Sequence, residues 1–318
     1  MSPLTSAQIR GNWATLLLPI RDDDSIDLAL LADEIDCFIA AHVSGIYSNG
    51  SAGEFHTQTE DEFDAINRLL ATKCNQAGMP FQIGASHMSA QLSLARLRRA
   101  KALAPSAFQV ILPDWFPLAW PEIIAFLDTM AAAAAPIPLV LYNPPHAKRR
   151  LVPEEWLELA TRVPGLAGIK VAGGDDAWYR AMQPVMARLS VFIPGHLLAT
   201  GLARGAHGAY SNVACLSPAG AQHWYELCVR DPAAGLRWQE KILPFWQDHI
   251  APLISTHGLP NMAADKAAAV AGGWLPGLTP RLRWPYRCAD AALIAPIAAA
   301  AHRAVPELFA WPTPPAAR

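Results

Sequence analysis

Short apolar runs alternate with longer amphipathic stretches through the first two thirds of the chain. The runs are hydrophobic on both faces and recur about every 25 to 35 residues. Runs of this kind are typical of parallel strands that are covered by helices. The pattern predicts eight strands, at residues 14–19, 43–48, 81–85, 108–112, 139–142, 168–171, 191–194 and 208–211.

The stretches between these strands have the spacing of amphipathic helices. Thr59 followed by Glu62 has the form of a capping box, and an aspartate just before residue 26 is expected to cap the first helix. Pro121 and Pro153 suit the first turn of two further helices. The predicted helices span 26–41, 59–73, 89–104, 121–134, 153–162, 177–187 and 197–204.

Strand and helix alternate often enough to predict an α/β fold, a (β/α)8 TIM barrel, in residues 1–217. A doubly wound open sheet also alternates strands and helices, but it usually carries a glycine-rich phosphate loop after its first strand. Here that segment is Arg21-Asp22-Asp23-Asp24, which has no glycine. Residues 218–318 contain no further strand pattern and several tryptophans, so we expect a C-terminal helical region packed on the barrel.

Composition narrows the class of protein. The chain has 318 residues, of which 52% are hydrophobic and 16% charged, with a formal net charge of −2. These values exclude a disordered chain and a basic surface for nucleic acid or anionic membranes. The five cysteines are scattered, no metal-ligand spacing stands out, and neither a signal peptide nor a membrane span is visible. We therefore expect a soluble cytoplasmic protein without a metal site.

Lys170 is the first candidate for chemistry. It is the only lysine that lies inside an apolar predicted strand, and it falls at the strand's carboxyl end, where barrel active sites lie. Burial disfavours the ammonium form, and a neutral amine can condense with a ketone to form a Schiff base. The alternative is a lysine that reaches the barrel rim and forms a structural ion pair.

Two further groups fall at carboxyl ends of predicted strands. Tyr142 could relay protons beside such an amine, or could be an ordinary buried tyrosine. The loop that contains Gly50-Ser51-Ala52-Gly53-Glu54 could direct several amide N–H groups and the Ser51 hydroxyl at a carboxylate, or could be a simple turn. If the barrel prediction holds, all of these groups face the same opening.

Three motifs in this order resemble the dihydrodipicolinate synthase and N-acetylneuraminate lyase family of Schiff-base barrel enzymes. They are Gly50-Ser51-Ala52-Gly53-Glu54, Tyr142-Asn143-Pro144-Pro145 and Gly168-Ile169-Lys170. The resemblance implies that Lys170 forms an imine with pyruvate or another 2-oxo acid and that Tyr142 relays protons. It also implies that Ser51 and the Ala52 amide hold the substrate carboxylate, while Gly195 and Tyr210 line the imine side. It implies no organic cofactor or metal, and a homo-oligomer, either a tetramer or a dimer.

The departures from the family pattern concern the second substrate. Ala147 stands where the synthases have an arginine that grips a carboxylate, and Trp115 stands where they have a tyrosine hydroxyl that enters the neighbouring subunit. His196 follows Gly195 where family members carry acidic residues. Each change removes a polar contact, so we expect a less polar partner, such as an aromatic aldehyde, near Trp115, His196 and Tyr210.

Two other functions fit the same motifs. A 2-keto-3-deoxy sugar acid dehydratase would use the same imine to eliminate water rather than to cleave a C–C bond. A non-catalytic sensor would bind a 2-oxo acid through the imine but would not turn it over.

Overall fold

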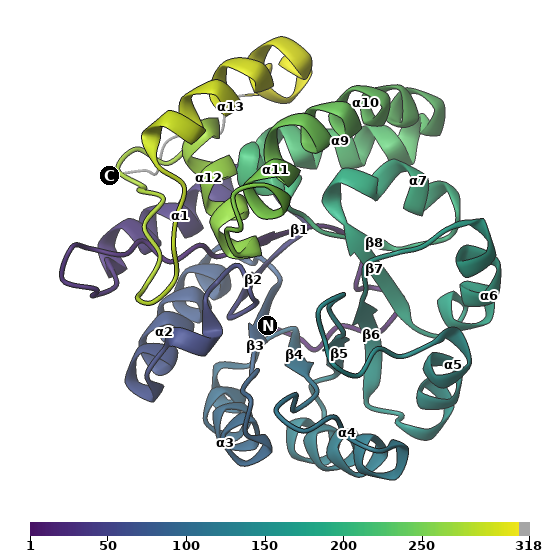
Figure 1. Ribbon diagram of the computed structural model, residues 1–318. Helices are drawn as coiled ribbons and strands as arrows, with labels where there is room; N and C mark the ends of the chain where they lie inside the picture. The colour runs from purple at the N-terminus through teal and green to yellow at the C-terminus, as the bar shows by residue number, and fades with distance from the viewer. Residues whose placement is uncertain (312–318) are drawn as a thin grey trace.

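A computed structural model of the chain describes residues 1–311. Eight parallel strands close into a barrel in sequence order, with β1 paired to β8 (Figure 1). This confirms the predicted TIM barrel. The strands are β1 (Gly11–Thr15), β2 (Gly45–Ser48), β3 (Phe81–Gly84), β4 (Ala107–Ile111), β5 (Leu139–Tyr142), β6 (Leu166–Lys170), β7 (Ser190–Pro194) and β8 (Gly208–Tyr210).

Helices surround the strands and cover the outer face of the barrel. The helices that alternate with strands are α1 (Leu28–Ala40), α2 (Glu60–Ala77), α3 (Ala90–Ala100), α4 (Trp120–Ala134), α5 (Pro153–Arg162), α6 (Asp176–Met186), α7 (Leu198–Ala203) and the single turn α8 (Val213–Leu216). Each strand pairs with a neighbour on both sides, so the sheet has no free edge. In β7, for example, Ser190 pairs with Gly168 of β6 and Phe192 pairs with Gly208 of β8. No helix within residues 1–311 is long and apolar enough to span a bilayer.

Most predicted strands lie within two residues of the observed ones, but the first was placed too late. β1 spans Gly11–Thr15 rather than 14–19. The apolar run continues past the strand because Leu16 to Leu18 remain fully buried in the loop that follows it. The carboxylate of Glu34 accepts the Leu17 N–H at 2.8 Å, which replaces the hydrogen bond that a strand neighbour would provide.

The helix caps follow the sequence signals with one correction. Thr59 and Glu62 form the expected capping box of α2. The first helix, however, is capped by Asp27, whose side chain accepts N–H bonds from Ala29 and Leu30, so the helix begins after the predicted start at residue 26. The earlier aspartates belong to the loop that precedes this cap.

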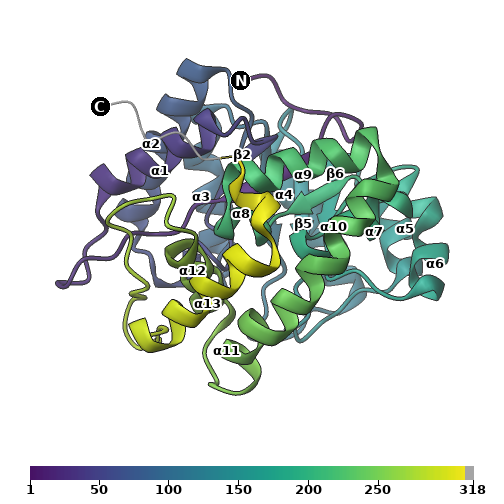
Figure 2. The same ribbon diagram turned by 90° about the horizontal axis from the view of Figure 1, so that it is seen from above.

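After residue 217 the described chain consists of helices and connecting loops, without a strand. The elements are α9 (Pro218–Arg230), α10 (Pro232–Phe245), α11 (Ala251–Ser255), α12 (Asn261–Gly272) and α13 (Ala291–Ala304). They gather on one side of the barrel, where α9 contacts β1 and α12 contacts α8 (Figure 2). Trp224, Trp246 and Trp274 are buried there, as their size requires. The division at residue 217 stays a prediction, and residues 312–318 of the predicted region lie outside the described part.

The contact between α12 and the barrel matters for the site. Trp274, just beyond α12, donates its indole N–H to the Cys215 carbonyl at 2.7 Å and packs against Phe38 of α1. This buried contact fixes the C-terminal helices against the barrel wall. The amino-terminal half of α12 is thereby held at the opening that the strand ends form.

Candidate active site

A cavity of about 270 Å³ lies at the carboxyl ends of the strands. Residues from six strands line it, including Tyr47 of β2, Tyr142 of β5, Lys170 of β6 and Tyr210 of β8. Residues from α12 complete its wall. This is the end of the barrel at which TIM-barrel enzymes carry their active sites.

Lys170 reaches into this cavity with few partners. Its Nζ donates one long hydrogen bond, 3.3 Å, to the Tyr47 hydroxyl, and it lies 4.1 Å from the centre of the Tyr142 ring and 5.1 Å from that of Tyr210. Burial lowers the pKa of Lys170 to about 8, although the charge of Asp265 acts in the opposite direction. At pH 7 about one amine in ten is therefore neutral and able to attack a carbonyl group.

Tyr142 lies directly beside the lysine. The two residues are paired in register across β5 and β6, as expected from their places at the ends of consecutive strands. Burial raises the pKa of Tyr142 to about 12, and a hydrogen bond with the Ser51 side chain partly opposes this shift. The phenol is thus protonated at neutral pH and can pass a proton between bound groups without itself becoming an anion.

The Ser51–Ala52 loop also reaches the cavity, and both residues line it. The flanking glycines are required for space. A Cβ on Gly50 would lie 2.9 Å from the Tyr47 ring, and one on Gly53 would lie 3.0 Å from the Leu16 carbonyl oxygen. The positive φ angles of this segment belong instead to Asn49 and Glu54. The loop is therefore compressed against the strand ends, which brings Ser51 to the cavity.

Glu54 anchors the same loop to the C-terminal helices. One carboxylate oxygen accepts a hydrogen bond from Lys266 Nζ at 2.7 Å, and the other accepts the Arg283 N–H at 3.1 Å. Both charged side chains of the Glu54–Lys266 pair are completely buried. Glu54 thus has a structural role, and it lies outside the reaction cavity.

The third group of predicted residues lies on the opposite wall. His196 and Tyr210 line the cavity, and Gly195 lies just behind it, where a Cβ would approach the Ser211 hydroxyl oxygen to 2.5 Å. The His196 ring stacks on Trp246 with an angle of 6°, and its Nδ1 contacts the Asn212 amide at 2.8 Å. Burial lowers the pKa of His196, which favours a neutral imidazole in the wall.

Trp115 is a predicted site residue that does not line the cavity, and unlike Gly195 it is not adjacent in the chain to a residue that does so. Its side chain is 76% exposed, and the Lys148 ammonium lies 5.2 Å from the centre of its ring. The neighbouring cations do not replace the missing arginine either. Arg149 pairs with Glu155, and Lys148, Arg149 and Arg150 line a separate surface groove.

Three polar residues with a bearing on the chemistry are among the cavity residues that sequence reasoning missed. Tyr47 supplies the hydroxyl that Lys170 contacts, and Asn261 and Asp265 reach the cavity from α12. Tyr47 lies inside a short apolar strand, and nothing in the local sequence indicates that its hydroxyl reaches the cavity. A usable signal was the pair Asp265–Lys266, since α12 otherwise consists almost entirely of small or apolar residues.

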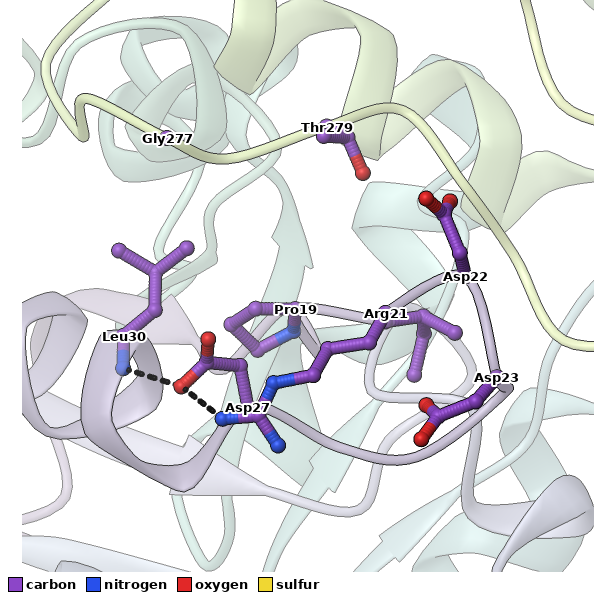
Figure 3. A pocket seen from close by; sticks show the side chains of 9 residues that line it. Pro19, Arg21, Asp22, Asp23, Asp27, Leu30, Gly277 and Thr279 are labelled. Carbon is purple, nitrogen blue, oxygen red and sulfur yellow. Dashed lines mark hydrogen bonds and ion pairs between the residues drawn. The ribbon is translucent and has the colours of Figure 1, made fainter.

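A second recess, of about 500 Å³, lies between the loop after β1 and residues 277–279 (Figure 3). In Figure 3 the Asp27 carboxylate points to the Leu30 backbone nitrogen and to the Arg21 side chain, so it serves as a helix cap and ion-pair partner. Within the described residues no group of three or more His, Cys, Asp or Glu side chains is arranged to hold a metal ion.

Comparison with known proteins places the chain in a family. The model of the Dihydrodipicolinate synthetase family matches residues 8–268. The chain belongs to this family. It is accordingly an enzyme of the lyase class, and family membership supports pyruvate-dependent Schiff-base chemistry at the level of the family.

Individual members differ in activity. A 4-hydroxy-tetrahydrodipicolinate synthase of Salinibacter ruber is 34% identical over 52% of this chain and 55% of that protein. One from Exiguobacterium sp. is 28% identical over 86% of this chain and 90% of that protein. An N-acetylneuraminate lyase of Rhizobium meliloti is 26% identical over 64% and 67% of the two chains.

A solved structure shows the same fold. YagE of E. coli K12, a member of the dihydrodipicolinic acid synthase family in complex with pyruvate, superposes with a TM-score of 0.83 and is 22% identical. The match covers 93% of this chain and 98% of that one. At this identity the likeness extends to the fold of the family member and does not identify a substrate for this chain.

Proposed function

We propose that this protein is a Schiff-base-forming lyase that cleaves or forms a C–C bond at the carbon next to the carbonyl group of pyruvate or a related 2-oxo acid. The observation that carries the proposal is the Lys170 amine, which lies in a cavity at the carboxyl ends of the strands with a lowered pKa. A structural lysine would be paired instead, as Lys266 is in the same molecule.

The surrounding groups support a defined course of reaction. Ser51 and the Ala52 amide would hold the carboxylate of the 2-oxo acid, which places its keto carbon near Lys170. Attack by the neutral amine and loss of water give an iminium ion. This cation withdraws electrons from the adjacent carbon, so a C–C bond there can break or form. Tyr142, protonated and next to the amine, would carry protons between the reacting oxygens.

A larger cavity, which adjoins the reaction cavity and is distinct from the recess near Asp27, supports a less polar partner substrate. It has a volume of about 580 Å³ and shares Ser51, Tyr142 and Asn261 with the reaction cavity. Ala147 lies in its wall, where a cation would be needed to hold a carboxylate. Most of the remaining wall is apolar or aromatic, with Phe55, Met88, Ile111, Leu112, Ile254, Leu259, Met262 and Tyr286. We propose that this region, and not the surroundings of Trp115, receives an aromatic or otherwise apolar aldehyde.

A homo-oligomer, a dimer or a tetramer, is part of the proposal. Trp115 and Phe116 follow β4 and are 76% and 78% exposed, an adjacent pair of large apolar side chains that a second copy of the chain could cover. Light scattering of the purified protein should give a multiple of the chain mass, and Trp115→Glu should lower it. We also propose a cytoplasmic location, which fits the scattered cysteines.

Product analysis tests the proposed reaction. Purified protein should condense pyruvate with an aromatic aldehyde, and cleavage of the resulting 4-hydroxy-2-oxo acid should release pyruvate. Aspartate semialdehyde should be a poor partner, so efficient formation of dihydrodipicolinate would contradict the apolar assignment. Water loss from a 2-keto-3-deoxy sugar acid without pyruvate release would indicate the dehydratase. Trapping of pyruvate without turnover of any partner would indicate the sensor.

A further inference from the structure

Asp265 is a buried carboxylate in the wall of the reaction cavity. It lies in α12, is 9% exposed, and lines the same cavity as Lys170. The Asn261 amide donates a hydrogen bond of 3.1 Å to one of its oxygens from one turn earlier in the helix. Within residues 1–311 no lysine or arginine forms a salt bridge with it, although it interacts electrostatically with Lys170 across the cavity.

Packing alone does not account for a carboxylate at this position. A buried charge without a salt-bridge partner destabilises the fold, and an apolar side chain of similar size would avoid this cost. The next residue, Lys266, points away from the cavity and is neutralised by Glu54. α12 thus directs the Lys266 charge away from the cavity, where it pairs with Glu54. It directs the Asp265 charge into the cavity that contains Lys170.

The tyrosines of the cavity cannot serve as the base that the amine needs. Burial raises the pKa values of Tyr47, Tyr142 and Tyr210, so at neutral pH all three hold their protons. They can relay a proton but cannot accept one permanently from an ammonium ion. Asp265 is the carboxylate in the cavity wall, and it can do so.

We propose that Asp265 is the proton-transfer partner and counter-ion of Lys170 during imine formation. This inference rests on the function proposed above and adds the group that prepares the amine. It also gives a reason for the polar residue pair Asn261–Asp265 at the place where the reaction cavity meets the apolar cavity, since Asn261 lines both.

The protons and electrons of the step balance. The Lys170 ammonium gives one proton to the Asp265 carboxylate and becomes a neutral amine. The amine's electron pair forms a bond to the keto carbon, and a second amine proton passes to the former carbonyl oxygen, by way of Tyr142. Asp265 then returns its proton to the resulting hydroxyl group, which leaves as water. The product is an iminium ion that bears one hydrogen on nitrogen, with the ionised Asp265 as its counter-ion.

The titrations of Asp265 and Lys170 are coupled, because each charge shifts the pKa of the other group. Burial raises the pKa of Asp265 to about 6, and the Lys170 charge acts in the opposite direction. Between roughly pH 6 and 8 the pair therefore shares one proton, the state that the mechanism requires. The other ionisable groups that face or adjoin Asp265 are His146, His196, Tyr47, Tyr142, Cys215 and the Glu54–Lys266 pair.

Cys215, His196 and Lys266 do not supply the same proton. Burial raises the pKa of the Cys215 thiol far above neutral and lowers that of His196, so both are uncharged across this range. Lys266 is occupied by Glu54 and by two carbonyl oxygens. A profile with limbs near 6 and 8 is therefore expected from Lys170 and Asp265.

The test is the initial rate at which borohydride traps pyruvate on the protein between pH 5 and 9.5, followed by intact mass. The wild-type rate should be bell-shaped, with limbs near pH 6 and 8. Asp265→Asn should trap at least tenfold more slowly at pH 7. Its rate should lack the limb near pH 6 and should rise only as the Lys170 amine loses its proton. Asp265→Glu should keep that limb. The matched control, Asp33→Asn, changes an exposed carboxylate on α1 and should leave rate and profile unchanged.

Each outcome has a defined meaning. Wild-type rate and profile in Asp265→Asn would overturn the inference while leaving the proposed function intact. If wild-type protein traps no pyruvate at all, the proposed function itself fails. Should Asp265→Asn not fold, the wild-type profile decides, because a rate that follows only the amine, with no limb near 6, contradicts a role for Asp265.

Discussion

Two lysines in this protein, the fully buried Lys266 and the half-buried Lys170 of the cavity, have opposite environments. Lys266 donates three hydrogen bonds of 2.7 Å, to the Leu18 carbonyl, the Glu54 carboxylate and the Arg281 carbonyl. Lys170 donates one hydrogen bond, of 3.3 Å, and otherwise faces aromatic rings. Burial acts to lower the pKa of both, but only Lys266 has a directly bonded carboxylate that opposes the shift.

The difference in hydrogen bonding distinguishes a lysine with a structural role from one with a proposed chemical role. An ammonium has three donors, and Lys266 satisfies all of them inside the protein, so its charge holds the Ser51 loop to α12. Lys170 leaves its donors largely unsatisfied. Its amine can therefore lose a proton readily and form a bond to a carbonyl carbon. The predictions below change one lysine environment at a time.

The largest effect is expected from removing the reactive amine. Lys170→Met should abolish pyruvate trapping and reduce turnover to background, because no other amine lies in the cavity wall among the described residues. Unfolding in urea should show unchanged or higher stability, since an incompletely paired ammonium is replaced by an apolar chain. Trapping that persists in this variant would mean that another residue forms the imine.

Removing the structural amine should have the opposite result. Lys266→Met leaves the Glu54 carboxylate buried without its partner, which should lower the free energy of unfolding by about 3–5 kcal/mol. The folded fraction should still trap pyruvate. Combining it with Glu54→Gln should restore part of the loss, because the uncompensated charge is then gone. A double variant that is as unstable as the sum of the two single variants would contradict the pairing.

The two tyrosines nearest Lys170 should also differ. Tyr142→Phe removes the proton relay, so turnover should fall by roughly 10²- to 10⁴-fold while pyruvate is still trapped. Tyr47→Phe removes a long hydrogen bond to Lys170 and a hydrogen bond with Thr15, neither of which transfers a proton in the proposed course, so turnover should fall less than tenfold. Steady-state kinetics with one aldehyde measures both. Equal losses in the two variants would contradict the assignment of the relay to Tyr142.

The smallest effect concerns stability at high pH. The folded-state pKa of Lys170, about 8, lies below its ordinary value of 10.5, so between these values the unfolded chain binds the extra proton. The free energy of unfolding should therefore gain a contribution that rises with pH over this window, by at most about 3 kcal/mol. Lys170→Met should lack this rise when urea unfolding is compared at pH 8 and pH 10. Parallel slopes in the two proteins would contradict the lowered pKa.

The barrel and the core of the site could be predicted because both depend on local patterns. The eight apolar runs fix the strands, and the residues that end them must meet at one opening. Lys170 and Tyr142 could therefore be placed at the ends of neighbouring strands from the sequence alone. The end of β1 could not, because burial continues beyond the strand and Glu34 replaces its hydrogen bond.

The residues that were missed depend on packing between distant segments. Asp265 follows Lys170 by almost a hundred residues and reaches the cavity only because α12 is fixed beside α8. Trp115 was expected near the second substrate, yet its strand end turns it outward, and the apolar wall comes from Phe55, Ile254 and Leu259 instead. Such convergence is set by the tertiary fold and leaves little trace in any single segment.

The most direct test is to map the residue that reacts. Wild-type protein should be reduced with borohydride in the presence of pyruvate, digested, and its peptides analysed by mass spectrometry. The account predicts one modified peptide, with the pyruvate-derived group on Lys170 and none on Lys266. A label on any other lysine, or no label at all, would contradict the central claim that the partly paired amine is the reactive one.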